Sequence, residues 1–340
     1  MEEVRMKIDL ICLLAVIGLT FPMHTASGVA QGAADIHVAA ARAAATQEHA
    51  TLFEGLCASP VFSPRSQSGP IRRQDPPDRG TWHADPVKVF DNLFYVGQTE
   101  YSAWAITTSG GIIIIDPLFD YSVEDEVVNG LTTLGLDPKM IKYVIVSHGH
   151  RDHVGGARYL QDRFGAHVVL SAADWDLINR SPSTWPKPKK DIVATDGQQL
   201  VLGDTTLTLY VTPGHTLGTI STLIPVKDGR NSHMAILWGG TGFNWLRGSA
   251  AYIAPETPAS FWFRLYSNSA KRLREIVATV EADVLLSNHP KYDGSETKLP
   301  AVSKRRLDQP HPYVIGNDSV RRFLTVAEEC ATAGLLRIGQ

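Results

Sequence analysis

The feature that most constrains this chain is a cluster of three histidines and one aspartate within residues 147–156, which read Ser-His-Gly-His-Arg-Asp-His-Val-Gly-Gly. The β-branched run Tyr143–Val146 precedes it and predicts a buried strand, and residues 157–164 after it predict a short helix. The cluster therefore follows the carboxyl end of a strand, where α/β folds build their functional sites. Imidazoles with a carboxylate suit a borderline metal ion such as zinc.

Two further strand ends carry a histidine. His215 stands in Thr-Pro-Gly-His-Thr at 212–216, after a strand that ends at Val211. His289 follows the apolar run 285–287 in the same way. Each histidine alone is more often ordinary than a ligand, but three strand ends that each present imidazole predict one shared metal site.

Periodicity and turn residues predict the remaining elements. Ser122 with Asp125 three residues later predicts a capping-box-like start of a helix. Gly203-Asp204 predicts the turn of a hairpin. Predicted helices cover 34–56, 122–134, 157–164, 172–178, 258–280 and 318–335, and predicted strands cover 88–97, 103–108, 111–115, 143–146, 166–170, 199–202, 206–211, 219–226, 234–238 and 282–287. Because strands and helices come in two batches, two sheets packed face to face with helices outside are expected.

These motifs, with the strand that ends Ile115-Asp116, make residues 88–300 resemble the metallo-β-lactamase superfamily. The resemblance implies an α/β (α+β) fold, a four-layer αβ/βα sandwich with the metal site at one edge between the two sheets. It implies two zinc ions per chain, the first held by His148, His150 and His215 and the second by Asp152, His153 and His289.

Three of the residues in this site have alternative interpretations. His289 is a zinc ligand or a structural loop histidine. Asp116 orients a ligand imidazole or is a satisfied carboxylate at a strand end. Thr241 makes a hydrogen bond at the edge of the substrate pocket or is a turn residue.

One departure from the wider superfamily concerns the stretch Leu237-Trp238-Gly239-Gly240-Thr241-Gly242. Many superfamily hydrolases, such as glyoxalase II-like enzymes, lactonases and RNA-processing nucleases, carry there an aspartate that bridges the two metals. This chain has neither that aspartate nor the cysteine ligand of two β-lactamase subclasses. The pattern is most similar to subclass B3, although Gln98 separates Gly97 from Thr99 where a direct Gly-Thr step is expected.

The resemblance implies a zinc-dependent hydrolase that opens the β-lactam amide by attack of a zinc-bound hydroxide. Asp152 is the predicted catalytic residue, since it would orient the hydroxide and help to deliver the proton. The alternatives are a dinuclear hydrolase of another ester, lactone or phosphodiester and a non-hydrolytic metal-binding protein. Trp104, Trp245 and Trp262 are candidates for an aromatic wall, but packing in the core is the favoured interpretation.

The N-terminus has the layout of a secretory signal peptide. A weakly basic start precedes the apolar segment Leu10–Phe21, and small residues follow, with expected cleavage near Ala30 or Ala33. An uncleaved anchor is the alternative, although the segment is short for a membrane span. A periplasmic or secreted protein without stable membrane insertion is therefore expected. In such a compartment Cys57 and Cys330 either pair or remain separate buried thiols.

The expected organisation is a signal peptide at 1–30, an N-terminal helix and Pro-rich arm at 31–86, the metallo-β-lactamase domain at 87–300, and an extension at 301–340 whose helix packs on the domain. A net charge of −3 over 340 residues gives no electrostatic basis for nucleic-acid binding. The expected partner is a small-molecule substrate, and the sequence leaves the oligomeric state open.

Overall fold

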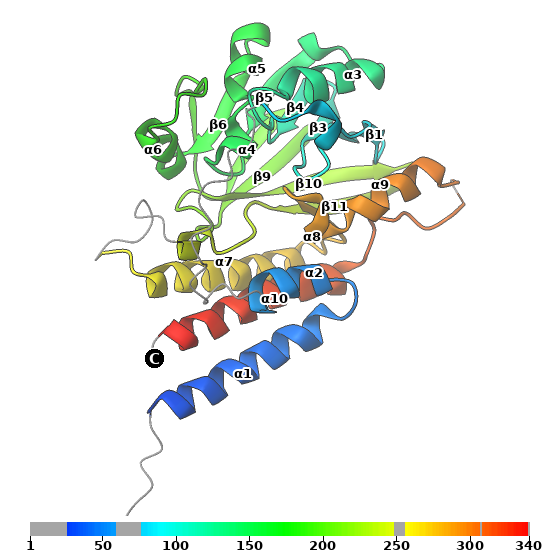
Figure 1. Cartoon of the computed structure of the whole chain (residues 1–340). Helices are drawn as coiled ribbons and strands as arrows, with labels where there is room; N and C mark the ends of the chain where they lie inside the picture. Colours follow the sequence, from blue (N-terminus) through cyan, green and yellow to red (C-terminus); the bar gives the residue numbers. More distant parts are fainter. Residues whose placement is uncertain (1–25, 59–75, 248–255, 307, 339–340) are drawn as a thin grey trace, which may run out of the picture.

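The computed structural model describes residues 26–58, 76–247, 256–306 and 308–338. Two β-sheets pack face to face, and helices cover the outer face of each (Figure 1). This is the four-layer sandwich that the sequence predicts. The predicted segment 1–30 lies mostly outside the described residues, as do positions 59–75 of the Pro-rich arm.

The first sheet has seven strands in the order β1 to β7. Strands β1 to β4 are antiparallel neighbours, and β4 to β7 run parallel. Most residues of the parallel strands β4, β5 and β6 are apolar and buried, because helices cover one face and the second sheet covers the other; Lys142 and His167 are exposed. The strands are β1 Val87–Lys88, β2 Leu93–Tyr95, β3 Trp104–Thr108, β4 Gly111–Ile115, β5 Ile141–Ile145, β6 His167–Ser171 and β7 Ile192–Ala194.

The second sheet has five strands in the order β12-β11-β10-β9-β8. Two hairpins build most of it, and the predicted β8–β9 hairpin around Gly203-Asp204 is confirmed. Strand β12 returns parallel to β11, which brings the carboxyl ends of both strands to the same edge. The strands are β8 Gln198–Leu202, β9 Thr205–Val211, β10 Ile220–Asp228, β11 Asn231–Trp238 and β12 Val284–Ser287.

Helices form the two outer layers. Those over the first sheet are η3 Glu124–Val128, α3 Asn129–Thr133, η4 Pro138–Met140, α4 Arg151–Val154, α5 Ala157–Phe164 and α6 Ala172–Arg180. The second sheet is covered by α7 Ala259–Thr279 and α10 Asn317–Ile338, and η5 Asn244–Arg247 leads toward α7. The short helices η2 Arg79–Thr81, α8 Pro290–Asp293 and α9 Ser295–Lys304 lie at the edge of the sandwich. None of the helices in the described part of the chain combines the length and the apolar character that crossing a bilayer requires.

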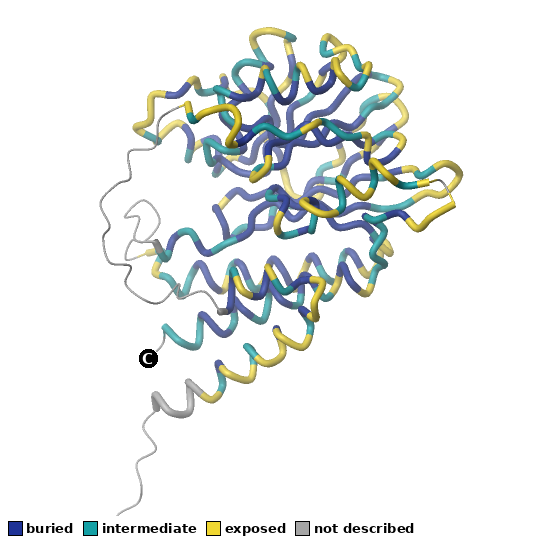
Figure 2. The backbone as a smooth tube through the Cα atoms, turned by 45° about the vertical axis from the view of Figure 1, so that its right-hand side comes forward, coloured by how far each residue is buried: buried dark blue, intermediate teal, exposed yellow. Residues whose placement is uncertain are grey.

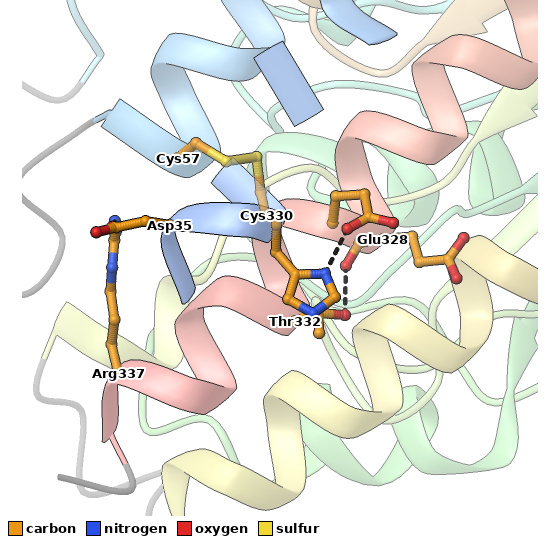
Figure 3. The surroundings of a disulfide bond; sticks show 8 residues. Asp35, Cys57, Glu328, Cys330, Thr332 and Arg337 are labelled. Carbon is orange, nitrogen blue, oxygen red and sulfur yellow. Dashed lines mark hydrogen bonds and ion pairs between the residues drawn. A yellow bond between two sulfur atoms is a disulfide. The ribbon is translucent and has the colours of Figure 1, made fainter. Parts of the chain in front are cut away.

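The N-terminal helices add a layer beyond the sandwich. Helix α1 Ala26–Ala45 lies against α10 on the side away from the sheets, and its outer face is exposed (Figure 2). Helix α2 Ala50–Phe53 and the π-helical turn η1 Glu54–Ala58 follow it. Cys57 and Cys330 form a disulfide that joins this layer to α10, and Asp35 pairs with Arg337 at 3.8 Å between α1 and α10 (Figure 3).

Several local predictions need correction. The predicted helix 34–56 is interrupted at Thr46, which has a positive φ of 49°. The predicted capping box is wrong: η3 starts after Val123 without a side-chain cap, and the Ser122 hydroxyl contacts the carbonyl oxygen of Phe119 at 3.5 Å. The single predicted strand 88–97 is two strands joined by a turn. Strand β7 and helices α8 and α9 were not predicted, because short or polar elements carry a weak periodic signal.

Candidate metal centre

The first group of predicted ligands comes from two loops that meet at one edge of the sheets. His148 and His150 stand on the loop between β5 and α4, and His215 stands on the loop after β9. Their candidate ligand atoms all lie within 4.8 Å of one another. His150 Nδ1 lies 3.2 Å from His215 Nε2. Two nitrogens bound tetrahedrally to one zinc ion at 2.0–2.1 Å lie about 3.3 Å apart, so this pair already has the separation of two ligands.

Backbone carbonyls orient these imidazoles. His148 Nδ1 donates to the carbonyl oxygen of Gly239 at 2.9 Å, and His215 Nδ1 donates to that of Gly242 at 2.8 Å. Each bond leaves Nε2 as the free electron-pair donor, as in known metal sites. His148 Nε2 is buried and has no hydrogen-bond partner among the described residues. An imidazole nitrogen that is buried without a partner fits a ligand position whose ion satisfies it.

The second group lies beside the first. Asp152 and His153 belong to α4, and His289 caps the start of α8 after β12. Their candidate ligand atoms also lie within 4.8 Å of one another, and Asp152 Oδ2 is 3.2 Å from His153 Nε2. His289 Nδ1 donates to the carbonyl oxygen of Glu100 at 3.1 Å, which leaves its Nε2 for an ion. The structure thus brings together the six residues that the sequence predicts as ligands.

Asp116 makes the contacts expected of a residue that orients a ligand. Its Oδ2 lies 3.0 Å from His153 Nδ1, on the opposite side of the imidazole from Asp152. Its two carboxylate oxygens accept hydrogen bonds from the backbone N–H and the hydroxyl of Ser147, both at 2.7 Å. Of the two interpretations left open by the sequence, the contact with His153 favours the orienting role.

The electrostatics of the site suit cations. Burial lowers the pKa of His150 and of His289 to about 4, and it also lowers the pKa of His148 and of His215. These imidazoles are therefore neutral near pH 7, which is the form that binds metals.

His153 differs from the other four histidines. Burial lowers its pKa, but the carboxylates of Asp152 and Asp116 outweigh burial and raise it to about 10. Burial raises the pKa of Asp152, but the neighbouring His153 outweighs it, so that the pKa lies well below its usual range. Positive charge is thus favoured where the second group of ligands converges.

The open side of the two groups is a cavity of about 370 Å³ with mostly polar walls. Thr241 lies at this cavity, and its hydroxyl is buried without a partner among the described residues. Gly240 packs so closely on His215 that a Cβ atom would lie 2.6 Å from the Cβ of the histidine. An aspartate at 240 would therefore displace a predicted ligand. Sequence reasoning missed Asn244, Lys291 and Tyr292 at the cavity, because nothing in their spacing marks them.

A second residue that the sequence did not reveal is Asp174 on α6. Its buried carboxylate accepts hydrogen bonds from the Gly149 N–H at 2.8 Å, the Thr216 hydroxyl at 2.7 Å and the Gly218 N–H at 3.0 Å. It thereby ties together the loops that carry His148, His150 and His215. Burial raises its pKa to about 6. In the sequence it appears as an ordinary acidic residue in the first turn of a helix.

The three tryptophans considered for an aromatic wall are packing residues. Trp104, Trp245 and Trp262 are 0%, 0% and 3% exposed and belong to the apolar core. They do not line the cavity at the metal centre.

Fold and site together define a class: a four-layer αβ/βα sandwich with two adjoining ligand sets, rich in histidine, at one edge of its sheets. Residues 96–228 match the family model of the metallo-β-lactamase superfamily, so the chain contains a domain of that superfamily.

Solved structures with this fold include metallo-β-lactamases. The subclass B3 metallo-β-lactamase BJP-1 of Bradyrhizobium japonicum is 25% identical with a TM-score of 0.60, and the similarity covers 72% of this chain and 91% of that one. The metallo-β-lactamase FEZ-1 of Legionella gormanii is 24% identical with a TM-score of 0.65, over 76% of this chain and 98% of that one.

Curated sequences give a different name. A hydroxyacylglutathione hydrolase of Acidiphilium cryptum (strain JF-5) is 30% identical over 121 residues, which are 36% of this chain and 43% of that protein. The chain spans about half or less of the length of the curated relatives that it matches. The chain is therefore similar to relatives with two different names, and the substrate has to be argued from the site.

Proposed function

We propose that this protein is an exported, zinc-dependent hydrolase that opens the amide bond of a β-lactam, with two zinc ions held by the two ligand sets. The donor set fits zinc, since the candidate ligand atoms of five imidazoles and one carboxylate gather in two adjoining groups, each within 4.8 Å. When bound, the ions would supply an activated water as nucleophile and polarise the substrate carbonyl.

The observation that carries this proposal is that the stretch 237–242 beside the two ligand sets has no aspartate: Gly240 packs against His215, and Thr241 lies at the cavity. Hydrolases of the glyoxalase II type are expected to bridge their two metals with an aspartate in this stretch. At 240 there is no space for one, because even a Cβ atom would lie 2.6 Å from the Cβ of His215. The site therefore supports a β-lactamase of the B3 type better than a thioester hydrolase, although several curated relatives carry the second name.

The residues of the chain itself would bind and orient the substrate. Asp152 lies at the cavity and would hold a proton-bearing oxygen nucleophile in one orientation by accepting its hydrogen bond. Thr241 lines the same cavity and would contact the substrate at its edge. Lys291 carries a positive charge at the opening and would attract the carboxylate of a β-lactam.

The test is a substrate panel with the purified mature chain. A penicillin, a cephalosporin, a carbapenem and a hydroxyacylglutathione thioester are each assayed with and without a chelator, at a measured zinc content. Turnover of β-lactams that the chelator abolishes and added zinc restores is the expected result. If the thioester is hydrolysed efficiently and the β-lactams are not, the ligand sets stand and the substrate assignment is wrong.

Export is tested separately from catalysis. The N-terminal sequence of the protein recovered from the periplasm or medium of an expressing bacterium should begin near residue 31 or 34. Recovery of uncleaved chain in the cytosol would contradict the proposed location without affecting the proposed chemistry.

A further inference from the structure

Asn288, which directly precedes the predicted ligand His289, is 0% exposed. Its side-chain nitrogen donates to the carbonyl oxygen of Gly239 at 2.8 Å and to the hydroxyl of Ser147 at 3.3 Å. Its backbone carbonyl oxygen accepts from the N–H of Ser102 at 3.0 Å. One buried residue therefore ties together three segments that are distant in sequence.

The first partner of the Asn288 amide belongs to the first ligand set. The Gly239 carbonyl oxygen also accepts from His148 Nδ1 at 2.9 Å, which is the bond that leaves Nε2 of that imidazole for an ion. A carbonyl oxygen has two lone pairs, so it can accept from both residues at once. The next residue, Gly240, packs against His215. The position of this short stretch therefore bears on two of the three ligands in the first set.

The second partner leads to the second ligand set. The Ser147 hydroxyl donates its proton to Asp116 Oδ2 at 2.7 Å, so its lone pairs remain to accept from Asn288. The same Oδ2 lies 3.0 Å from His153 Nδ1. A continuous path of polar contacts thus runs from the Asn288 amide to a ligand of the second set.

Both partners require a donor, and this fixes how the amide is oriented. The side-chain nitrogen of asparagine carries two N–H groups, one for each partner, whereas Oδ1 in its place would face another acceptor at Gly239. In the observed orientation Oδ1 is buried without a hydrogen-bond partner among the described residues. A buried acceptor without a partner reduces stability. Stabilisation of the fold alone therefore does not explain an asparagine here.

We propose that Asn288 is a positioning residue that holds both ligand sets in their metal-binding arrangement. It acts on the first set through the carbonyl group that orients His148, and on the second set through Ser147 and Asp116. This inference rests on the proposed zinc sites and not on the proposed β-lactam substrate. A wild-type chain that binds no zinc would overturn both proposals, whereas failure to hydrolyse β-lactams has no bearing on this one.

Asn288→Leu tests the proposal, because leucine has a similar size and no donor. Zinc affinity is measured on the full chain by competition with a chromophoric chelator that resolves the two ions. Since partners of metal ligands typically contribute 10–100-fold to affinity, both ions should bind at least about tenfold more weakly. Asn179→Leu, at an exposed position on α6, is the control and should bind both ions as the wild type does. Unchanged affinity for both ions in Asn288→Leu would overturn the proposal.

Thermal unfolding of the zinc-free chain separates positioning from a merely structural role. In Asn288→Leu the Gly239 carbonyl keeps its bond from His148 and the Ser147 hydroxyl keeps its bond to Asp116, while the unsatisfied Oδ1 is removed. The midpoint should therefore change by less than about 3 °C. A larger decrease would show that Asn288 chiefly stabilises the fold. In the cobalt(II)-loaded protein, the visible absorption should differ from that of the wild type, because it reports the geometry of the ligands.

Ser147→Ala tests the two arms of the network separately and keeps Asn288 in place. It removes the contact that leads to Asp116, but the bond from Asn288 to the Gly239 carbonyl remains. One zinc ion should bind about tenfold more weakly, and the affinity for the other should stay within about twofold of the wild type. An equal loss for both ions, or no loss for either, would contradict the two separate paths and overturn the proposal.

Discussion

At the scale of single residues, the shape of the metal centre depends on what individual backbone positions allow. Asp116 has a φ of 57°, in the left-handed region that asparagine and aspartate tolerate better than other side chains. That conformation directs its carboxylate to both Ser147 and His153. Gly240 shows the opposite requirement, since its missing side chain makes room for His215.

Replacing Asp116 by asparagine should weaken metal binding without unfolding the chain. Asparagine tolerates the same φ, and its oxygen can keep the bond to the Ser147 N–H. Its amide N–H would donate toward His153 Nδ1. The ring proton would then move to Nε2, which is the nitrogen that an ion needs. Because partners of ligands typically contribute 10–100-fold to metal affinity, we expect a loss of about that size in competition titrations with a zinc chelator.

The matched control is Asp308→Asn, since the Asp308 side chain is 72% exposed and pairs with the exposed Arg306. Its zinc affinity should equal that of the wild type. Equal affinity in Asp116→Asn as well would show that the aspartate merely satisfies the end of its strand.

Adding one methyl group at Gly240 should damage the first ligand set. The Cβ of Gly240→Ala would lie 2.6 Å from the Cβ of His215, a distance that forces either the loop or the histidine to move. Overpacking of this kind typically costs 1–3 kcal/mol, and we expect about that loss in the free energy of unfolding together with a lower zinc content. Gly32→Ala on α1 is the control, because nothing lies within 4 Å of its added Cβ. A fully loaded and stable Gly240→Ala protein would contradict the steric argument for substrate class.

At the scale of elements, the sequence predicts well what is local. Strands β4, β5 and β12 consist mostly of apolar residues, and a residue of the centre follows each within three positions, namely Asp116, His148 and His289. Both the strand and the loop after it are therefore visible in the sequence. For the same reason the predicted helix 157–164 agrees with α5 residue for residue.

What depends on long-range contacts was not predictable. Asp174 joins two ligand loops from a helix whose sequence signals only a capped start. The space beside Gly240 and the hydrogen bonds of Asn288 depend on packing between segments that are distant in sequence. The sequence could name Cys57 and Cys330 as possible partners, but only the layer formed by α1, α2 and α10 brings them together.

The disulfide should stabilise this helical layer strongly. It joins residues separated by 273 positions, and closing a long loop removes much of the freedom of the unfolded chain. Removal of native disulfides typically costs 2–5 kcal/mol, and we expect about that decrease in urea unfolding of Cys57→Ser/Cys330→Ser. Reductant should lower the stability of the wild type to the same extent and leave the double variant unaffected. A wild type that does not respond to complete reduction would contradict the prediction.

At the scale of the whole molecule, three apolar layers hold the chain together. One lies between the outer helices and the first sheet, one between the two sheets, and one between the second sheet and the helices α1, α2, α7 and α10. Since the third layer combines both ends of the described chain, its integrity depends on contacts between the N-terminal helices and α10. His49, which is 2% exposed, is a polar contact of this kind.

The stability of that junction should decrease in mild acid because of His49. Burial lowers the pKa of His49, and the positive charges of Arg322 and Lys298 lower it further, against the opposing effects of its bond to the Ser319 carbonyl and of Glu48. The unfolded state therefore takes up its proton first, so that stability is fully present above pH 6.5 and falls as the pH drops through and below that value. Urea unfolding at pH 8, 7, 6 and 5 should show this fall in the wild type. His49→Gln should show a smaller fall in stability over the same pH range. Because zinc release in acid is common to both proteins, the difference between them isolates the contribution of this one imidazole. Identical pH profiles would show that His49 contributes nothing.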